Sequence, residues 1–139
     1  MAEPLYLFVY GTLRPPRADT APGDSYNYSH IAEHVLEIHP ATVSGAELYD
    51  CGPYPAARPG EGLLHGELLL VEPAALRITD RIEGHPHLYH RERITVQTDR
   101  DRVEAWVYWA SGELVADRER IAGGDWFERC GGDLSRDFD

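Results

Sequence analysis

Lysine is absent from this 139-residue chain, and all 13 of its basic residues are arginine. The absence excludes Schiff-base chemistry and every other reaction that needs a lysine nucleophile. Positive charge is scarce as a whole, because 24 aspartates and glutamates bring the formal net charge to -11. A chain with this charge repels phosphates and anionic headgroups, so we expect no nucleic acid and no membrane as a partner.

Cysteines and long apolar runs are also few. Cys51 and Cys130 have no neighbours at metal-ligand spacing, so reduced thiols are expected, with a disulfide between them left open. The apolar runs at residues 5–9 and 68–71 are too short to cross a bilayer, and the first residues lack the basic and apolar regions of a signal peptide. We therefore expect a cytoplasmic protein that folds as one domain over residues 1–139.

Apolar spacing predicts a chain made mostly of strands, with one or two short helices. The expected strands are Leu5–Tyr10, Ala41–Tyr49, Leu63–Val71, Arg93–Gln97 and Val103–Trp109. The expected helices are Ser29–Ile38 and Pro73–Glu83, the second bounded by a proline and by Gly84. Residues 15–24, 50–62 and those from Gly123 onward are expected to be loops. These elements favour an α+β fold, a curled sheet or small barrel with attached helices.

One glutamate lies on the apolar side of the second expected helix, where a charged residue is not expected. On a helical wheel, Glu83 falls in the apolar arc, seven residues after Leu76 and four after Thr79. Burial would raise its pKa toward neutrality, which suits a general acid or base. The alternative is that Glu83 ends a frayed helix and reaches solvent or pairs with Arg91.

A glycine turn follows the first expected strand. Gly11 would allow a positive φ, so that successive backbone N–H groups converge on an anion, and Thr12 and Arg14 would add donors. The turn lacks the spacing of a phosphate-binding glycine-rich loop. The alternative is an ordinary turn at the end of a strand.

These two features belong to an ordered set of short motifs that covers nearly the whole chain. The set resembles the γ-glutamylcyclotransferase superfamily, also called AIG2-like or BtrG-like. The matching stretches are Val9–Arg14 (VYGTLR), Gly45–Tyr49 (GAELY), Gly52–Ala56 (GPYPA), Gly66–Leu68 (GEL), Asp80–Gly84 (DRIEG), Tyr89–Arg91 (YHR), Ala105–Tyr108 (AWVY) and Gly124–Trp126 (GDW).

The resemblance implies a small mixed β-barrel with short helices packed around it, and an enzyme that works without cofactor or metal. It implies that a γ-glutamyl amide, a small molecule, is converted to 5-oxoproline and a free amine. Glu83 would be the catalytic acid and base. The substrate α-carboxylate would lie against a loop formed by Tyr10, Gly11, Thr12 and Leu13, with Tyr89 near the substrate.

Two departures from the family pattern concern the substrate more than the chemistry. Thr79 stands where the family usually has leucine, and residues 15–40 form a longer and more polar stretch than expected. Two other functions stay open at this point: a non-catalytic protein that binds a small carboxylate or a protein partner, and an amidase in which Glu83 activates water.

Several other polar residues are expected to have ordinary structural roles. His85, His87 and His90 lack a defined metal-ligand spacing. Glu47 and Glu67 lie within strands, where solvent-facing or paired side chains are expected, and Glu47 is the second candidate for a catalytic carboxylate. Cys51 has no obvious partner base for a nucleophilic role.

Overall fold

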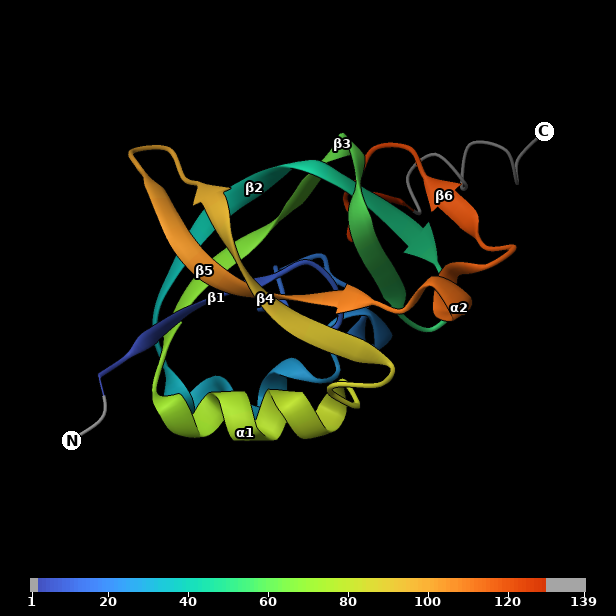
Figure 1. Cartoon of the computed structure of the whole chain (residues 1–139). Helices are drawn as coiled ribbons and strands as arrows, with labels where there is room; N and C mark the ends of the chain where they lie inside the picture. Colours follow the sequence, from blue (N-terminus) through green and yellow to red (C-terminus); the bar gives the residue numbers. More distant parts are fainter. Residues whose placement is uncertain (1–2, 130–139) are drawn as a thin grey trace.

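Five strands close into a mixed barrel in the computed structural model, which describes residues 3–129 (Figure 1). Their order around the barrel is β3-β1-β5-β4-β2, and pairing of β2 with β3 closes it. Only the β1–β5 pair of the barrel is parallel. The short strand β6 extends the sheet beside β2. The strand bounds are β1 Leu5–Val9, β2 Val35–Asp50, β3 Pro55–Val71, β4 Tyr89–Gln97, β5 Arg102–Ala110 and β6 Glu119–Ile121.

The helices are short and lie outside the barrel. They are α1 Pro73–Ile82, α2 Gly112–Val115 and the 3-10 helices Pro22–Asp24, Tyr28–His30 and Ala32–His34. Figure 1 shows α1 lying across the barrel beneath the strands. Within residues 3–129, no helix has the length and apolar character needed to cross a membrane. The predicted α+β fold of a small mixed barrel with short helices is confirmed.

Alternation along the strands divides the core into two layers. On β1, Phe8 points into the barrel, where it packs with Leu68 and Val107. Its neighbour Leu7 points the other way and packs with Leu76 of α1. Because both faces of β1 are buried, its residues form a continuous apolar run, as they do in fully covered strands. The end of β1 is therefore fixed between the interior of the barrel on one face and α1 on the other.

The helix predicted at Ser29–Ile38 is wrong. Two 3-10 helices occupy its first part, and β2 begins at Val35. Val35 pairs with Val71, and Ile38 pairs with Leu69. The β-branched Val35 and Ile38 suit a strand, and pairing with β3 prevails over a helical spacing that is only local.

The predicted loop at residues 50–62 is also mostly wrong, because β3 already begins at Pro55. The glycines that suggested a turn instead lie where other parts of the chain come too close to leave room for a side chain. A Cβ on Gly60 would lie 2.4 Å from the side chain of Glu47, and one on Gly62 would lie 2.8 Å from the carbonyl oxygen of Ala46. Glycine at these positions lets β2 and β3 stay paired where other groups fill the space of a side chain.

Candidate active site

All six residues predicted from the sequence as a site line one pocket. The pocket has a volume of about 200 Å³ and lies between the end of β1, the end of α1 and the start of β4. The lining residues are Val9, Tyr10, Gly11, Thr12, Leu13, Tyr26, Asn27, Tyr54, Pro55, Ile82, Glu83, Leu88, Tyr89, Tyr108 and Leu114. The six come from three separated parts of the chain, which the barrel brings together.

Glu83 caps the C-terminus of α1 and lines this pocket. Its backbone N–H donates to the carbonyl of Thr79 at 2.8 Å, so the residue continues the helical turn. Within residues 3–129, no group hydrogen-bonds to its carboxylate, and the side chain is only partly exposed. Burial raises the pKa of Glu83 to about 8. A carboxyl group of this kind takes up and releases a proton near neutral pH.

The suggested pairing of Glu83 with Arg91 is wrong, because Arg91 is bound to Asp80. Its Nε and Nη2 donate to the two Asp80 carboxylate oxygens at 2.6 and 2.9 Å. The Tyr108 hydroxyl donates to Asp80 at 2.6 Å and lies 2.6 Å from the hydroxyl of Thr79. This network joins the last turn of α1 to β4 and β5, and it leaves Glu83 without a cation partner among residues 3–129.

The loop after β1 lines the same pocket and carries free backbone donors. It turns at Gly11, whose carbonyl accepts from the N–H of Arg14 at 3.0 Å. The backbone N–H groups of Gly11, Thr12 and Leu13 donate no hydrogen bond to any of the described residues. Adjacent unpaired N–H groups that face a pocket are suited to bind an anion.

The predicted positive φ at Gly11 is wrong. Positive values occur at four other glycines within residues 3–129, and not at Gly11. A Cβ at this position would lie 2.6 Å from Cγ of Pro55, at the start of β3. Glycine is needed here because the loop packs directly against the ring of Pro55.

Two buried tyrosines complete the inner wall. The hydroxyl of Tyr10 donates to the carbonyl of Tyr108 at 2.6 Å, and that of Tyr89 donates to the carbonyl of Pro55 at 2.9 Å. Burial raises the pKa of Tyr10, and the neighbouring Tyr89 and Glu83 raise it further. Burial and Glu83 likewise raise the pKa of Tyr89. Both therefore stay neutral, with their protons committed to the backbone.

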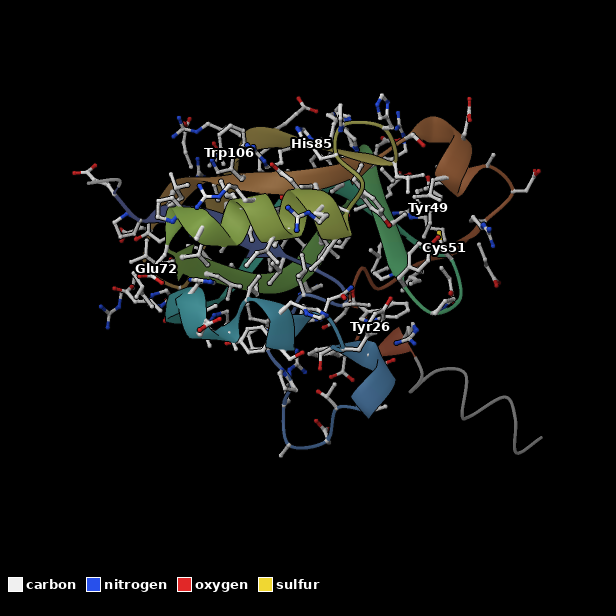
Figure 2. The ribbon with its side chains drawn as sticks, turned by 90° about the horizontal axis from the view of Figure 1, so that it is seen from below. Tyr26, Tyr49, Cys51, Glu72, His85 and Trp106 are labelled. Atoms are coloured by element: carbon white, nitrogen blue, oxygen red, sulfur yellow. The ribbon has the colours of Figure 1, made fainter. Side chains whose placement is uncertain are left out.

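The sequence alone did not identify the outer wall of the pocket. Tyr26 and Asn27 come from the polar stretch after the loop, and Figure 2 shows Tyr26 on that stretch when the molecule is viewed from the side of α1. Tyr54 lies between β2 and β3, Leu88 lies between α1 and β4, and Leu114 belongs to α2. Motif order had identified residues 15–40 as unusual for the family, but not the two residues that face the site.

Cys51 lies beside the pocket without lining it. Its side chain is buried, and its Sγ lies 3.8 Å from the carbonyl oxygen of Leu114. Burial raises the pKa of the thiol, which keeps it protonated and disfavours a nucleophilic role. The disulfide left open above involves Cys130, which lies outside the described residues.

The remaining polar candidates have partners away from the pocket. His85 Nδ1 accepts from the N–H of Arg91 at 3.2 Å, and His90 pairs with Glu92 at 2.9 Å, while His87 is exposed. Two carboxylates are also paired, as expected. Glu67 binds Arg14 at 2.7 Å, and Glu47 accepts a hydrogen bond from Tyr49 at 2.9 Å.

Comparisons with known proteins agree on one family. A family model described as gamma-glutamyl cyclotransferase, AIG2-like, matches residues 7–128. The γ-glutamylcyclotransferase family protein YtfP of Escherichia coli K12 is 30% identical over 123 residues, which are 88% of this chain and 96% of that protein. The solution structure of E. coli ytfP, 29% identical, superposes with a TM-score of 0.65 over 91% of this chain and 99% of its own.

A mammalian structure has the same fold. The crystal structure of an AIG2-like protein from Mus musculus is 25% identical and has a TM-score of 0.65, with 85% of this chain and 86% of that chain covered. The family match extends from β1, which leads into the loop, to the residues just after Asp125, and it includes α1 and Glu83. The chain belongs to the AIG2-like γ-glutamyl cyclotransferase family.

Proposed function

We propose that this pocket releases an amine from a γ-glutamyl amide and forms 5-oxoproline, with Glu83 as the general base and acid. The observation that carries the proposal is the environment of Glu83. Its carboxylate has no partner within residues 3–129 and its pKa is raised to about 8. Glu83 also lines the same small pocket as the loop residues whose N–H groups are free. An anion-binding loop beside a proton-transfer group is what cyclisation of a γ-glutamyl group requires.

The reaction needs two ends of one substrate to meet. The α-amine nitrogen attacks the γ-carbonyl carbon, which closes a five-membered lactam, and the bond from that carbon to the departing nitrogen breaks. Glu83 takes a proton from the attacking nitrogen and returns one to the departing nitrogen, so the carboxylate is regenerated. Binding of the α-carboxylate by the N–H groups of Gly11, Thr12 and Leu13 orients the amine toward the carbonyl.

The outer wall indicates what the released amine contacts. Tyr26, Tyr54, Leu88 and Leu114 are aromatic or apolar, and no arginine or histidine is among the described residues that line the pocket. A second carboxylate on the departing amine would find no cation there. We therefore expect γ-glutamyl amides of simple amines to react faster than the corresponding γ-glutamyl amino acids.

Product analysis tests the proposed function directly. The protein is incubated with γ-glutamyl-phenethylamine and with γ-glutamyl-phenylalanine, which differ only by one carboxylate, and with γ-glutamyl-ε-lysine and glutathione. We expect 5-oxoproline and free amine, with γ-glutamyl-phenethylamine preferred over its partner. Free glutamate in place of 5-oxoproline would identify an amidase, and no turnover of any substrate would leave a binding protein.

Activity is expected to rise with pH up to about 8. Because burial raises the pKa of Glu83 to about 8, its basic form is the minor one at lower pH. Below that value kcat/KM should increase about tenfold per pH unit. The side-chain carboxyl carbon of Glu83, followed by NMR and assigned with the Glu83→Gln variant, should titrate with a midpoint near the same pH. A midpoint near 4.5, the ordinary value, would contradict this prediction.

A further inference from the structure

A side-chain amide from outside the loop contacts the loop at its centre. The Asn27 amide nitrogen donates to the hydroxyl oxygen of Thr12 at 2.9 Å, and the Asn27 backbone N–H donates to the Thr12 carbonyl at 3.1 Å. Both residues line the pocket. Asn27 thus holds Thr12 by two hydrogen bonds, one to the side chain and one to the backbone.

The direction of the side-chain bond decides where the Thr12 proton goes. A hydroxyl has one proton to donate and lone pairs that accept. Since the Thr12 oxygen accepts from Asn27, its proton stays available, and no hydrogen bond within residues 3–129 uses it. Thr12 is 8% exposed, and the space beside it is the pocket. The hydroxyl can therefore donate to an anion that the neighbouring N–H groups bind.

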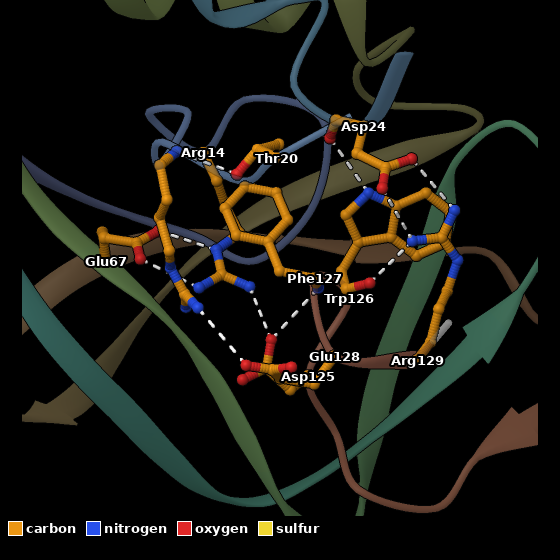
Figure 3. Close-up of polar contacts among 10 residues, drawn as sticks. Arg14, Thr20, Asp24, Glu67, Asp125, Trp126, Phe127, Glu128 and Arg129 are labelled. Carbon is orange, nitrogen blue, oxygen red and sulfur yellow. Dashed lines mark hydrogen bonds and ion pairs between the residues drawn. The ribbon is translucent and has the colours of Figure 1, made fainter. Parts of the chain in front are cut away.

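The position of Asn27 is itself fixed, by contacts three residues earlier in the chain. The Asp24 carbonyl accepts from Nε1 of Trp126 at 3.0 Å, and the Asp24 carboxylate binds Arg129 at 3.0 Å (Figure 3). The Arg129 guanidinium lies over the Trp126 ring. Trp126 is fully buried in the barrel core, so the segment that carries Asn27 is anchored to that core.

We propose that Asn27 is a positioning residue, which orients the Thr12 hydroxyl as a further donor to the ligand carboxylate. The proposal rests on the proposed function, because there the ligand carboxylate is the α-carboxylate of the γ-glutamyl group. Asn27 acts through Thr12, so its removal should weaken carboxylate recognition and leave the proton transfer by Glu83 in place.

Two ligands that differ only in the carboxylate separate this role from a structural one. Binding of 5-oxoproline and of 2-pyrrolidinone is titrated by NMR for the wild type, Asn27→Ala, Thr12→Val and the double variant. We expect Thr12→Val to weaken 5-oxoproline binding about tenfold and Asn27→Ala about fivefold. The double variant should lose about tenfold, as Thr12→Val does, and not the fiftyfold of independent effects. Binding of 2-pyrrolidinone should stay the same in all four proteins.

Ser29→Ala is the matched control. It removes a hydroxyl from the same segment, where Ser29 is exposed and, among the described residues, its hydroxyl hydrogen-bonds only to the carbonyl of Tyr26, at 3.5 Å. It should leave both affinities unchanged. In turnover, Asn27→Ala should raise KM about fivefold with kcat nearly unchanged.

Equal weakening of both ligands by Asn27→Ala, or additive effects in the double variant, would overturn the role of Asn27. Failure of the proposed function has a different signature. In that case no γ-glutamyl amide yields 5-oxoproline, whatever the binding data show.

Discussion

Glu83→Gln is expected to lower kcat/KM for 5-oxoproline formation about 1000-fold. Glutamine keeps the size of the side chain and its place at the end of α1, but its amide cannot take up and return a proton. The unpaired state of the Glu83 carboxylate strengthens this expectation, because no ion pair is broken by the change. Initial rates of 5-oxoproline release, measured at pH 8 with the best γ-glutamyl amide, provide the test.

The same variant should be more stable than the wild type at pH 8. Burial raises the pKa of Glu83 from 4.5 when the chain is unfolded to about 8 when it is folded. Between these values the folded protein holds a proton that the unfolded chain has lost, so the wild type loses stability as the pH rises from 4.5 to 8. Glutamine does not titrate. Urea unfolding should show a gain of about 4 kcal/mol for Glu83→Gln at pH 8 and almost none near pH 4.

Glu47→Gln is the matched control for activity. Glu47 carries the same side chain, but it lies outside the pocket and pairs with Tyr49 and Arg120. Its replacement should leave kcat/KM within about twofold, because no proton transfer depends on it. A folded Glu83→Gln protein with full activity would remove Glu83 from the mechanism. Loss of activity in Glu47→Gln alone would transfer the role to Glu47.

The placement of Glu83 could be predicted from the sequence because it depends on one short helix. The apolar arc that ends in Ile82 continues at Glu83, so a local period of 3.6 residues is enough to place the carboxylate on the inner face. The loop at Gly11 was predictable as a position, since it ends a buried strand. Its conformation was not, because the contact that requires glycine comes from Pro55, 44 positions later in the chain.

The outer wall could not be predicted for the same physical reason. Asn27 contacts Thr12, and the segment that carries it is bound through Asp24 to Trp126 and Arg129, more than 100 positions away. No periodicity marks such contacts. The short stretch from Ser29 to Ile38 even suggested a helix, whereas pairing with β3 draws its second half into the barrel. Local patterns therefore predicted the positions of Glu83 and of the loop at Gly11, and long-range pairing determines the shape of the pocket around them.

Arg14→Met is expected to lower the free energy of unfolding by about 3 kcal/mol. The Arg14 side chain is only 1% exposed and follows the loop directly. Its Nε and Nη2 bind the Glu67 carboxylate at 2.7 and 2.9 Å, and its Nη1 binds Asp125 at 2.9 Å (Figure 3). The ring of Phe127 covers the guanidinium at 3.9 Å. Methionine would fill much of the space but would leave the Glu67 carboxylate buried without its cation.

Arg17→Met is the matched control, because it shows how much the same substitution changes the free energy of unfolding at the surface. Arg17 pairs with Glu128 at 3.5 Å, and its side chain is 43% exposed. Such a pair contributes little, so Arg17→Met should change stability by less than about 0.5 kcal/mol. Urea unfolding followed by tryptophan fluorescence compares the two variants. Equal losses of stability in the two variants would show that the buried ion pairs of Arg14 with Glu67 and Asp125 do not hold the loop in place.

A second substitution isolates the electrostatic part. If the unpaired Glu67 carboxylate causes the loss, Arg14→Met combined with Glu67→Gln should regain about 1 kcal/mol or more relative to Arg14→Met alone. No recovery of stability would mean that the packing of Arg14 against Phe127 is what matters.

Activity measures whether the Gly11 loop depends on Arg14, because both variants keep Glu83. It is measured at a temperature where the variants are folded. A rise in KM with little change in kcat is expected, because in the proposed mechanism the loop holds the substrate and Glu83 moves the proton.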